Sequence, residues 1–435
     1  MKKRWSPLAA CSLALLGASI PAEAAGTPSL EQMWELIQRQ QQEIERLKAL
    51  NRALEQKMDA AGEAIDQARQ AAAQADAKAG PGTVAEAHAE SGAHTPFHHG
   101  LSGRTTVGGY GELHYNNLSG KGGAKDKDEI DFHRFILFLN HEFDARTRFA
   151  SELEVEHAFV EDEGNKTEEN TAPGEVALEY AFVERDLTDQ LQLRAGMLLV
   201  PAGIINETHE PPTFYGVERN PVETNIIPTT WREGGVSLIG RPAPGWQYDI
   251  VLHSGLGISG GSNFAVRDGR KGVGKAPAND PAVTTRIKWT GFPGLELGAA
   301  FQYQTDIGQG TDPSVGSAHL WEGHAALTRG RFGLRALYAR WDLNGPGPKS
   351  VGADVQEGWY IEPSFKVTPE IGVFTRYNVW NNQAGQKGPT EKRQWDVGLN
   401  YWPHADVVFK VDYQQQENED GKDQNGFNVG VGYMF

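Results

Sequence analysis

Apolar and polar residues alternate in short runs from Arg104 to Phe435, and this alternation limits the possible folds more than any other feature of the chain. From Leu295 to Gln304, for example, Leu, Leu, Ala, Phe and Tyr occupy every second position. Successive side chains of a β-strand point to opposite faces, so such a run predicts a strand with one apolar face. We expect sixteen strands, at residues 104–117, 128–143, 146–160, 174–187, 190–199, 232–240, 245–255, 282–290, 294–305, 317–328, 331–342, 354–367, 370–380, 391–402, 405–416 and 425–435.

The connections between these runs alternate in length. Seven contain only two to four residues, and the segments between them are longer and rich in glycine and charge. Short turns that alternate with long loops, together with an even number of strands, are typical of transmembrane β-barrels of the outer membrane. A soluble β-sandwich has no reason to keep this alternation. The predicted fold class is therefore an all-β transmembrane barrel of about 16 antiparallel strands, spanning 104–435.

The first 24 residues read as a secretory signal peptide. Residues 2–4 are basic, 8–20 form a short apolar stretch, and the small residues at 22 and 24 predict cleavage after Ala24. An alternative lipoprotein box ends at Cys11, but it leaves almost no apolar region after Arg4. A mature chain cleaved at Ala24 has no cysteine and hence no disulfide framework.

Residues 25–80 carry an apolar heptad repeat that predicts a coiled coil in the periplasm. Isoleucine at several a positions favours a trimer over a dimer. The segment could instead tether the outer membrane to the cell wall. Residues 81–103 read as a linker, whose histidines match no metal-ligand motif. The residues expected to carry self-association are Ile37, Ile44, Leu47, Asn51 and Leu54.

The last strand ends in an apolar stripe. Phe427, Val429, Val431, Tyr433 and Phe435 share one face. This pattern is similar to the C-terminal strand that outer-membrane proteins present to the barrel-assembly machinery. With the signal peptide, it predicts the outer membrane of a Gram-negative bacterium as the location and membrane lipid as a partner.

Charge and motifs exclude several classes of function. The formal net charge is −16, whereas proteins that bind nucleic acid present a basic surface to the phosphates. We expect no Gly-x-Ser-x-Gly nucleophile elbow, no His-Glu-x-x-His motif and no matched nucleophile and base; Ser254 and Ser259, each followed by glycine, read as turn residues. We therefore expect no enzymatic activity, no cofactor and no metal.

The polar face of the strands carries many charges, which would be costly to bury in a packed interior. A water-filled lumen removes that cost, so the pattern predicts a channel for passive diffusion of ions and small hydrophilic solutes. The outward face has aromatic residues near the strand ends, Tyr180 and Trp321 among them, as candidates for the interfacial girdles. The expected basic wall of the lumen consists of Arg194, Arg286, Lys288, Arg335, Arg376 and Lys410.

The long connection at 201–231 differs from the other loops because it mixes apolar anchors with charges. Folded inward, it would bury the anchors against the barrel wall and present its charges to the lumen as the constriction. The alternative is an external lid or a contact loop between trimer subunits. The expected constriction residues are Glu207, His209, Glu210, Glu218, Arg219 and Glu223.

Three stretches carry a family resemblance: residues 110–116 (Tyr-Gly-Glu-Leu-His-Tyr-Asn), 194–203 with the loop that follows, and the terminal Phe435. Together they resemble the phosphate-selective porin O and P family. The resemblance implies a homotrimeric sixteen-stranded porin whose third loop narrows the lumen. Phosphate-selective members use basic pore residues, whereas this loop has one arginine, four glutamates and no lysine between Ala202 and Thr230. Three alternatives for the solutes that pass the channel therefore stay open: a preference for anions, no preference, and a preference for cations.

Overall fold

The computed structural model describes residues 104–158 and 174–435. The predictions for the signal peptide, the coiled coil with its self-association residues and cell-wall tether, and the linker all fall on 1–103, outside the described residues. No helix in the described part of the chain is long and apolar enough to cross a membrane.

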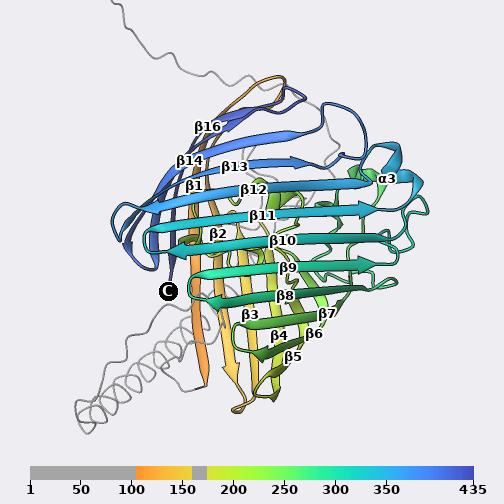
Figure 1. The fold of residues 1–435 in the computed structure, drawn as a ribbon, viewed down its shortest axis with the longest axis vertical. Helices are drawn as coiled ribbons and strands as arrows, with labels where there is room; N and C mark the ends of the chain where they lie inside the picture. Colours follow the sequence, from red (N-terminus) through yellow and green to blue (C-terminus); the bar gives the residue numbers. More distant parts are fainter. Residues whose placement is uncertain (1–103, 159–173) are drawn as a thin grey trace, which may run out of the picture. The chain divides into compact units, whose positions relative to one another are not determined.

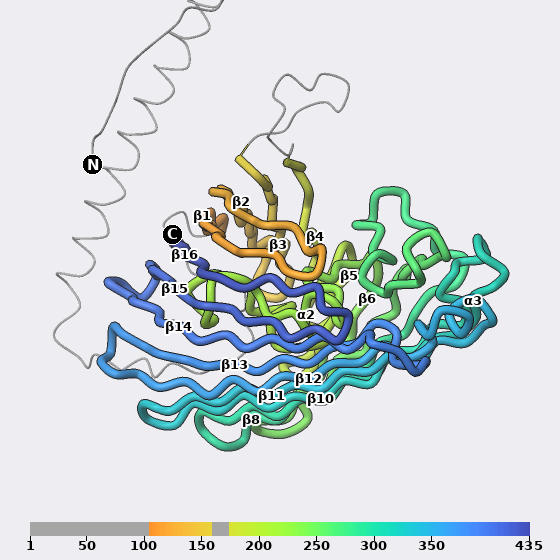
Figure 2. The backbone as a smooth tube through the Cα atoms, turned by 90° about the horizontal axis from the view of Figure 1, so that it is seen from above, coloured from red at the N-terminus to blue at the C-terminus, as the bar shows by residue number. Residues whose placement is uncertain are grey.

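Sixteen antiparallel strands close into one barrel (Figures 1 and 2). Each strand pairs with its neighbours in sequence, and β1 pairs with β16 to complete the ring. The strands are β1 (Thr105–Gly120), β2 (Lys127–Glu142), β3 (Thr147–Glu156), β4 (Val176–Thr188), β5 (Leu191–Leu199), β6 (Arg232–Ala243), β7 (Trp246–His253), β8 (Ala282–Phe292), β9 (Leu295–Gln304), β10 (Ala318–Arg329), β11 (Phe332–Leu343), β12 (Val355–Lys366), β13 (Ile371–Asn381), β14 (Lys392–His404), β15 (Val407–Gln416) and β16 (Gln424–Met434). The predicted fold class and the order of strands are confirmed, and strand ends differ from the expected ones by a few residues.

The C-terminus takes part in the closure of the barrel. The amide of Phe435 donates to the carbonyl of Gly109 and the amide of Gly109 donates to the carbonyl of Phe435, both at 2.9 Å. Because the ring has no free edge, every strand has a hydrogen-bonding partner on both sides, as a barrel in hydrocarbon requires.

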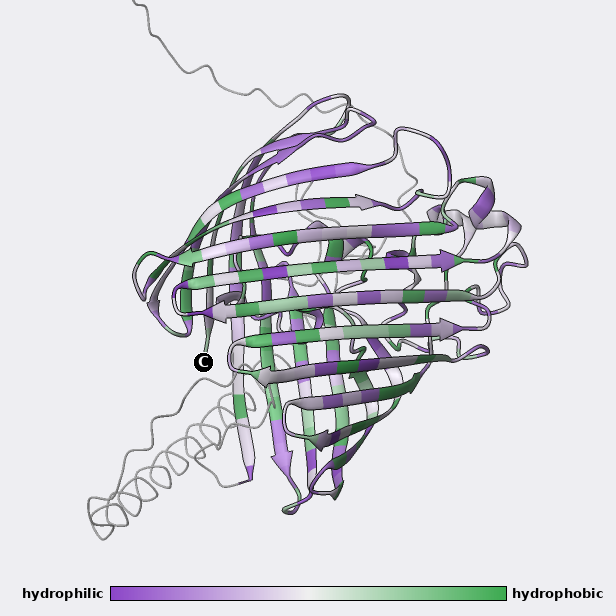
Figure 3. Cartoon of the chain, viewed as in Figure 1, coloured by the Kyte–Doolittle hydropathy of each residue, from purple (hydrophilic) through white to green (hydrophobic). Residues whose placement is uncertain are grey.

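The two faces of the strands differ as the alternation predicts (Figure 3). Trp321 and Val397 are exposed on the outer surface, while their neighbours Glu322 and Asp396 are buried inside. An apolar outer surface against lipid and a charged inner surface against water satisfy both solvents.

Tyr180 corrects one prediction, because it points into the barrel rather than toward lipid. Its side chain is only 8% exposed and lines an interior cavity. Between β3 and β4 the register shifts, so that Glu152 opposes Tyr180 while Leu153 opposes Leu178. Glu179 is the extra residue of this β-bulge, and consecutive residues 179 and 180 both lie inside.

Part of the interior is apolar, which the simple inside-polar pattern did not predict. Inward residues of β10–β13, including Trp341 and Tyr360, pack against Ile226 and Trp231 of the 201–231 loop and Leu256 of the 254–281 loop. These wall positions can be apolar because loops, rather than water, cover them.

The lipid-facing side can be tested at Ile287, which is 51% exposed near the middle of β8. Ile287→Arg is expected to lower the free energy of unfolding by about 2–4 kcal/mol, the cost of a cation near the bilayer midplane. Urea unfolding in lipid bilayers measures this, with Ile287→Val as the control. An arginine variant as stable as the control would contradict the assignment of this face to lipid.

Candidate functional site

The 201–231 loop lies inside the barrel and reaches the opposite wall. It contains two 3-10 turns, Ile205–Glu207 and Pro211–Thr213, and the short helix α2 (Pro221–Asn225), which the strands surround (Figure 2). The indole of Trp402 donates to the Pro212 carbonyl at 3.1 Å, and Asn400 donates to the Phe214 carbonyl at 3.0 Å. The loop is therefore not an external lid.

Glycines on β16 make room for this crossing. A Cβ atom on Gly432 would lie 2.2 Å from Cβ of Pro211, far inside van der Waals contact. One on Gly430 would lie 3.1 Å from a Val217 methyl group. The alternate glycines of the C-terminal strand thus let the loop backbone approach the wall closely.

Glu223 anchors the loop and corrects a second prediction, because its side chain does not face the lumen. It is 0% exposed. One carboxylate oxygen accepts from the amides of Ile204 and Ile205, at 2.8 and 2.6 Å, and the other accepts from the Tyr360 hydroxyl at 2.8 Å. Its sequence neighbour Asn220 caps α2 by accepting from the Glu223 amide. Through these hydrogen bonds Glu223 holds the loop against the barrel wall.

Two cavities flank the loop. The long-loop cavity, of about 840 Å³, is lined by ends of the long connections such as Lys271 and by Glu218 and Arg219 of the loop. The short-turn cavity, of about 860 Å³, is lined by short-turn residues such as Gly330 and by Glu207 of the loop. Since loop residues border both, the loop separates the two water-accessible halves of the lumen.

The other expected constriction residues are spread around the loop. Glu207 pairs with Arg286 on β8. Glu210 lines a third, smaller side cavity of about 420 Å³ between the loop and strands β1–β7 and β16. His209 is buried against Glu179 rather than open to the lumen, which corrects its expected place in the constriction. Of the expected constriction residues, Glu218 and Arg219 are the two that line the long-loop cavity.

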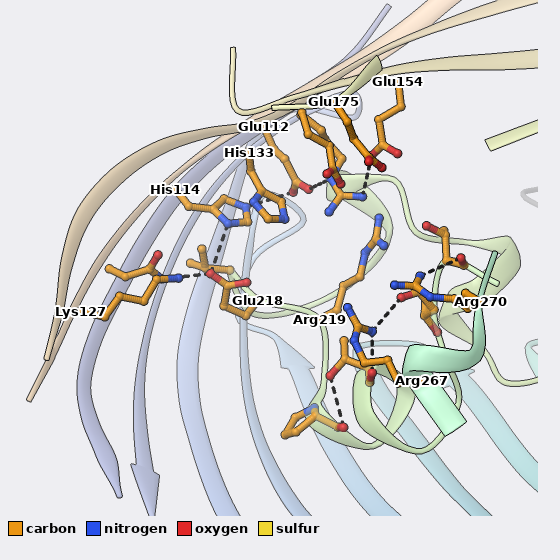
Figure 4. Close-up of a pocket in the computed structure, with 18 of the residues that line it drawn as sticks. Glu112, His114, Lys127, His133, Glu154, Glu175, Glu218, Arg219, Arg267 and Arg270 are labelled. Carbon is orange, nitrogen blue, oxygen red and sulfur yellow. Dashed lines mark hydrogen bonds and ion pairs between the residues drawn. The ribbon is translucent and has the colours of Figure 1, made fainter. Parts of the chain in front are cut away.

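Three arginines form a cluster in the long-loop cavity: Arg219, Arg267 and Arg270 (Figure 4). Arg267 donates to the Thr224 carbonyl at 2.5 Å, and Arg270 donates to the Thr230 carbonyl at 3.0 Å, so loop carbonyls orient both guanidinium groups. Within the described ranges, none of the three pairs with a carboxylate, and Nε and Nη2 of Arg219 have no hydrogen-bond partner.

The arginine cluster raises the local positive potential. Burial, together with the charge of Arg267 and other nearby arginines, lowers the pKa of Arg270 to about 10. Arg270 therefore stays cationic at neutral pH, but at a cost that a bound anion would reduce. Sequence reasoning missed Arg267 and Arg270, although the basic run 267–271 in a long loop was a visible signal.

Three carboxylates of this cavity, Glu112, Glu154 and Glu218, contact basic residues. Arg134 pairs with Glu112 at 2.8 Å and with Glu154 at 3.3 Å. His114 lies 3.1 Å from Glu112 and 3.3 Å from Glu218. The hydrogen bond and charge of His114 hold the pKa of the loop residue Glu218 well below its usual range. Further carboxylates line this cavity: Glu156, Glu175 and Asp268.

Comparison with known proteins gives the architecture its context. Residues 280–435 match the family model of phosphate-selective porin O and P, which confirms the resemblance over that stretch. OmpF of Salmonella typhi, solved with daunomycin, superposes with a TM-score of 0.53 at 13% identity, covering 76% of this chain and 97% of that one. The chain has the porin fold.

Two further proteins are similar to this chain, one in structure and one in sequence. OprB of Pseudomonas putida gives a TM-score of 0.51 at 10% identity, over 76% of this chain and 94% of that one. In sequence, an uncharacterized protein of Aquifex aeolicus (strain VF5) is 29% identical over 371 residues, covering 76% of this chain and 80% of that protein.

In this porin barrel the expected basic wall is mostly paired with acids, which corrects its reading as a positive surface. Four of its members have carboxylate partners on neighbouring elements: Arg194 with Glu184, Arg286 with Asp249 and Glu207, Lys288 with Glu296, and Arg376 with Glu362 and Asp396. Cross-strand pairing of opposite charges explains this. Lys410 lies 3.5 Å from the centre of the Phe214 ring, and Arg335 donates to the Thr213 carbonyl.

One motif needs a correction of its own. Residues 257–261 read Gly-Ile-Ser-Gly-Gly and so match Gly-x-Ser-x-Gly, the nucleophile motif of some hydrolases. Ser259 has extended backbone and precedes a three-residue 3-10 turn (Gly260–Ser262) in a loop, rather than joining a strand to a helix. The motif therefore lacks the strand–turn–helix context that would expose a nucleophile.

Proposed function

We propose that the protein is a water-filled outer-membrane channel for passive diffusion of small hydrophilic solutes, with a preference for anions. The observation that carries this proposal is the division of a closed barrel into two water-accessible cavities by the inward loop, together with the cluster of Arg219, Arg267 and Arg270, which has no carboxylate partner among the described residues. The 201–231 loop would be the constriction.

The preference for anions rests on which charges remain unpaired. Arg219, Arg267 and Arg270 offer guanidinium groups to the long-loop cavity, and planar guanidinium donors suit phosphate and carboxylate oxygens. The short-turn cavity adds basic residues without a described carboxylate partner: Arg331, Arg335 and Lys366. The matched family description, phosphate-selective porin, and the structural match to an anion-selective porin from Comamonas acidovorans (TM-score 0.50, 12% identity, 76% and 99% coverage) agree with this preference.

Three parts of the proposal concern assembly. The chain would act as a homotrimer in the outer membrane of a Gram-negative bacterium, inserted by the barrel-assembly machinery. Residues 25–80 would extend into the periplasm and support the trimer. No catalytic step is part of the proposed function.

Bilayer recordings test the proposal directly. Purified full-length protein in a planar bilayer is expected to give ohmic steps and, in a KCl gradient, a reversal potential of the sign that chloride permeation produces. A reversal potential of the opposite sign would contradict the anion preference. Insertion without any current would contradict the channel itself.

A further inference from the structure

We infer that Glu152, Glu179 and His209 form a binding site for a divalent transition-metal ion of the Zn²⁺ type, which joins the inward loop to the barrel wall. Glu152 comes from β3, Glu179 from the bulge of β4, and His209 from the loop. All three side chains are buried. The family resemblance and the proposed transport function do not call for such a site.

The donor atoms have the spacing that a metal ion needs. Nε2 of His209 lies 3.0 Å from Oε2 of Glu179 and 3.6 Å from Oε1 of Glu152, and the three donor atoms lie within 4.8 Å of one another. Zinc binds imidazole nitrogen and carboxylate oxygen at about 2.0–2.2 Å, so tetrahedral ligands lie roughly 3.3 Å apart. The two distances from His209 fall on either side of this value.

Outer contacts orient the donors toward a common point. Nδ1 of His209 lies 3.2 Å from the Asn206 carbonyl, which can accept the Nδ1 proton, and Nε2 contacts Glu179. A metal ion at Nε2 would displace the Nε2 proton while the Asn206 carbonyl kept the ring in place. The hydroxyl of Thr230 donates to Oε1 of Glu179 at 2.7 Å, which leaves Oε2 facing His209. Metal-binding histidines and carboxylates are held by contacts of this kind.

One buried carboxylate oxygen of the site has no hydrogen bond, which favours a cation as its partner. Glu152 is 1% exposed, and its Oε1 atom has no hydrogen-bond partner among the described residues. Two adjacent buried carboxylates repel each other unless a cation or a proton lies between them. Arg232 approaches only the outer oxygen of Glu179, at 3.7 Å. A divalent ion would neutralise the inner oxygens.

The side cavity gives access to two of the three donors. Glu152 and His209 both line this cavity, which lies between the loop and strands β1–β7 and β16. An ion arriving through this cavity would reach the donors without unfolding of the loop. Three protein ligands and one open position are a common arrangement for zinc.

A second histidine group is the natural comparison. Asp131, His133 and His157 also lie within ligand distance of one another. There the two carboxylate oxygens of Asp131 already contact the two imidazole Nδ1 atoms, at 2.8 and 2.9 Å. This group is satisfied by its own hydrogen bonds and serves as the matched control.

Metal titration tests the site. Full-length protein is purified in detergent, stripped with a chelator and titrated with ZnCl₂. We expect one Zn²⁺ per monomer and a rise in the thermal unfolding midpoint. Glu152→Gln should abolish this stoichiometric binding, and Thr230→Val, which removes an outer contact, should weaken it about 10-fold or more. His157→Asn should bind like the unmodified protein.

Two controls separate this site from the alternatives. Co²⁺ in place of Zn²⁺ should give the visible absorption of a tetrahedral site in the unmodified protein and in His157→Asn, but not in Glu152→Gln. Heat-modifiable electrophoretic mobility checks that each variant folds, and Thr230→Val provides the test if Glu152→Gln does not. Absence of Zn²⁺ binding, or binding lost only in His157→Asn, would overturn the inference and leave His209 as an imidazolium between two carboxylates.

Discussion

Replacement of Arg219, Arg267 and Arg270 by glutamine is expected to lower the anion-to-cation permeability ratio at least about fivefold. At about 8 Å and an effective dielectric constant of about 20, one unit charge changes the energy of a monovalent ion by about 2 kcal/mol before ionic screening. Described carboxylates do not pair with these guanidinium groups, so their field acts on the solute. Reversal potentials in KCl gradients at low ionic strength measure the ratio, since salt screens such fields.

A matched arginine outside the lumen is the control. Arg340 pairs with Asp342 and Glu357 and does not line any of the cavities beside the loop. Arg340→Gln removes the same charge as Arg219→Gln and should leave the reversal potential unchanged. Glu218→Gln should shift selectivity toward anions. If the triple arginine variant keeps the original permeability ratio, the cluster does not set the selectivity.

Excision of the inward loop is expected to raise single-channel conductance several-fold. Both sides of the loop border water-accessible cavities, so its removal would merge the long-loop and short-turn cavities into one lumen. The ends of the loop are adjacent, because the Val200 amide donates to the Trp231 carbonyl at 2.9 Å. A short glycine–serine link can therefore replace residues 204–228. Conductance is measured in 1 M KCl.

A milder variant and a control accompany the excision. Glu223→Ala leaves the amides of Ile204 and Ile205 and the Tyr360 hydroxyl without their acceptor, at about 1–3 kcal/mol for each unpaired group. It should loosen the loop and increase open-channel current noise. Removal of residues 385–389, in the long connection between β13 and β14, should change neither quantity. Equal conductance in the unmodified and excised proteins would show that the constriction lies elsewhere.

Local patterning predicted some site residues and failed on others for reasons that the structure explains. Glu218 and Arg219 were expected to face the lumen, and they line the long-loop cavity. Glu223 has the same charge and lies on the same loop, yet its side chain caps backbone amides. Sequence spacing cannot separate these cases, because an irregular loop has no fixed periodicity that assigns residues to faces.

Contacts between distant parts of the chain account for the remaining differences. Trp402 and Pro212 are 190 positions apart and Asn116 and Glu218 are 102 apart, yet each pair is hydrogen-bonded. Tyr180 turned inward because a single bulge at Glu179 shifted the strand by one residue. Neither a cross-lumen contact nor a bulge leaves a periodic trace in the chain.

The sequence by itself determined the sixteen strands, their order and, apart from the bulged strand β4, which side of each strand meets lipid or the barrel interior. It could do so because each residue of a barrel strand faces either lipid or the barrel interior, and the polarity of its side chain indicates which. Only the tertiary structure decided which interior charges are neutralised, where the loop is pinned, and which arginines remain unpaired. Those outcomes depend on distances of a few Å between residues that are far apart in the chain. Coulomb energy changes steeply over such distances, and separation along the sequence does not give the distance in space.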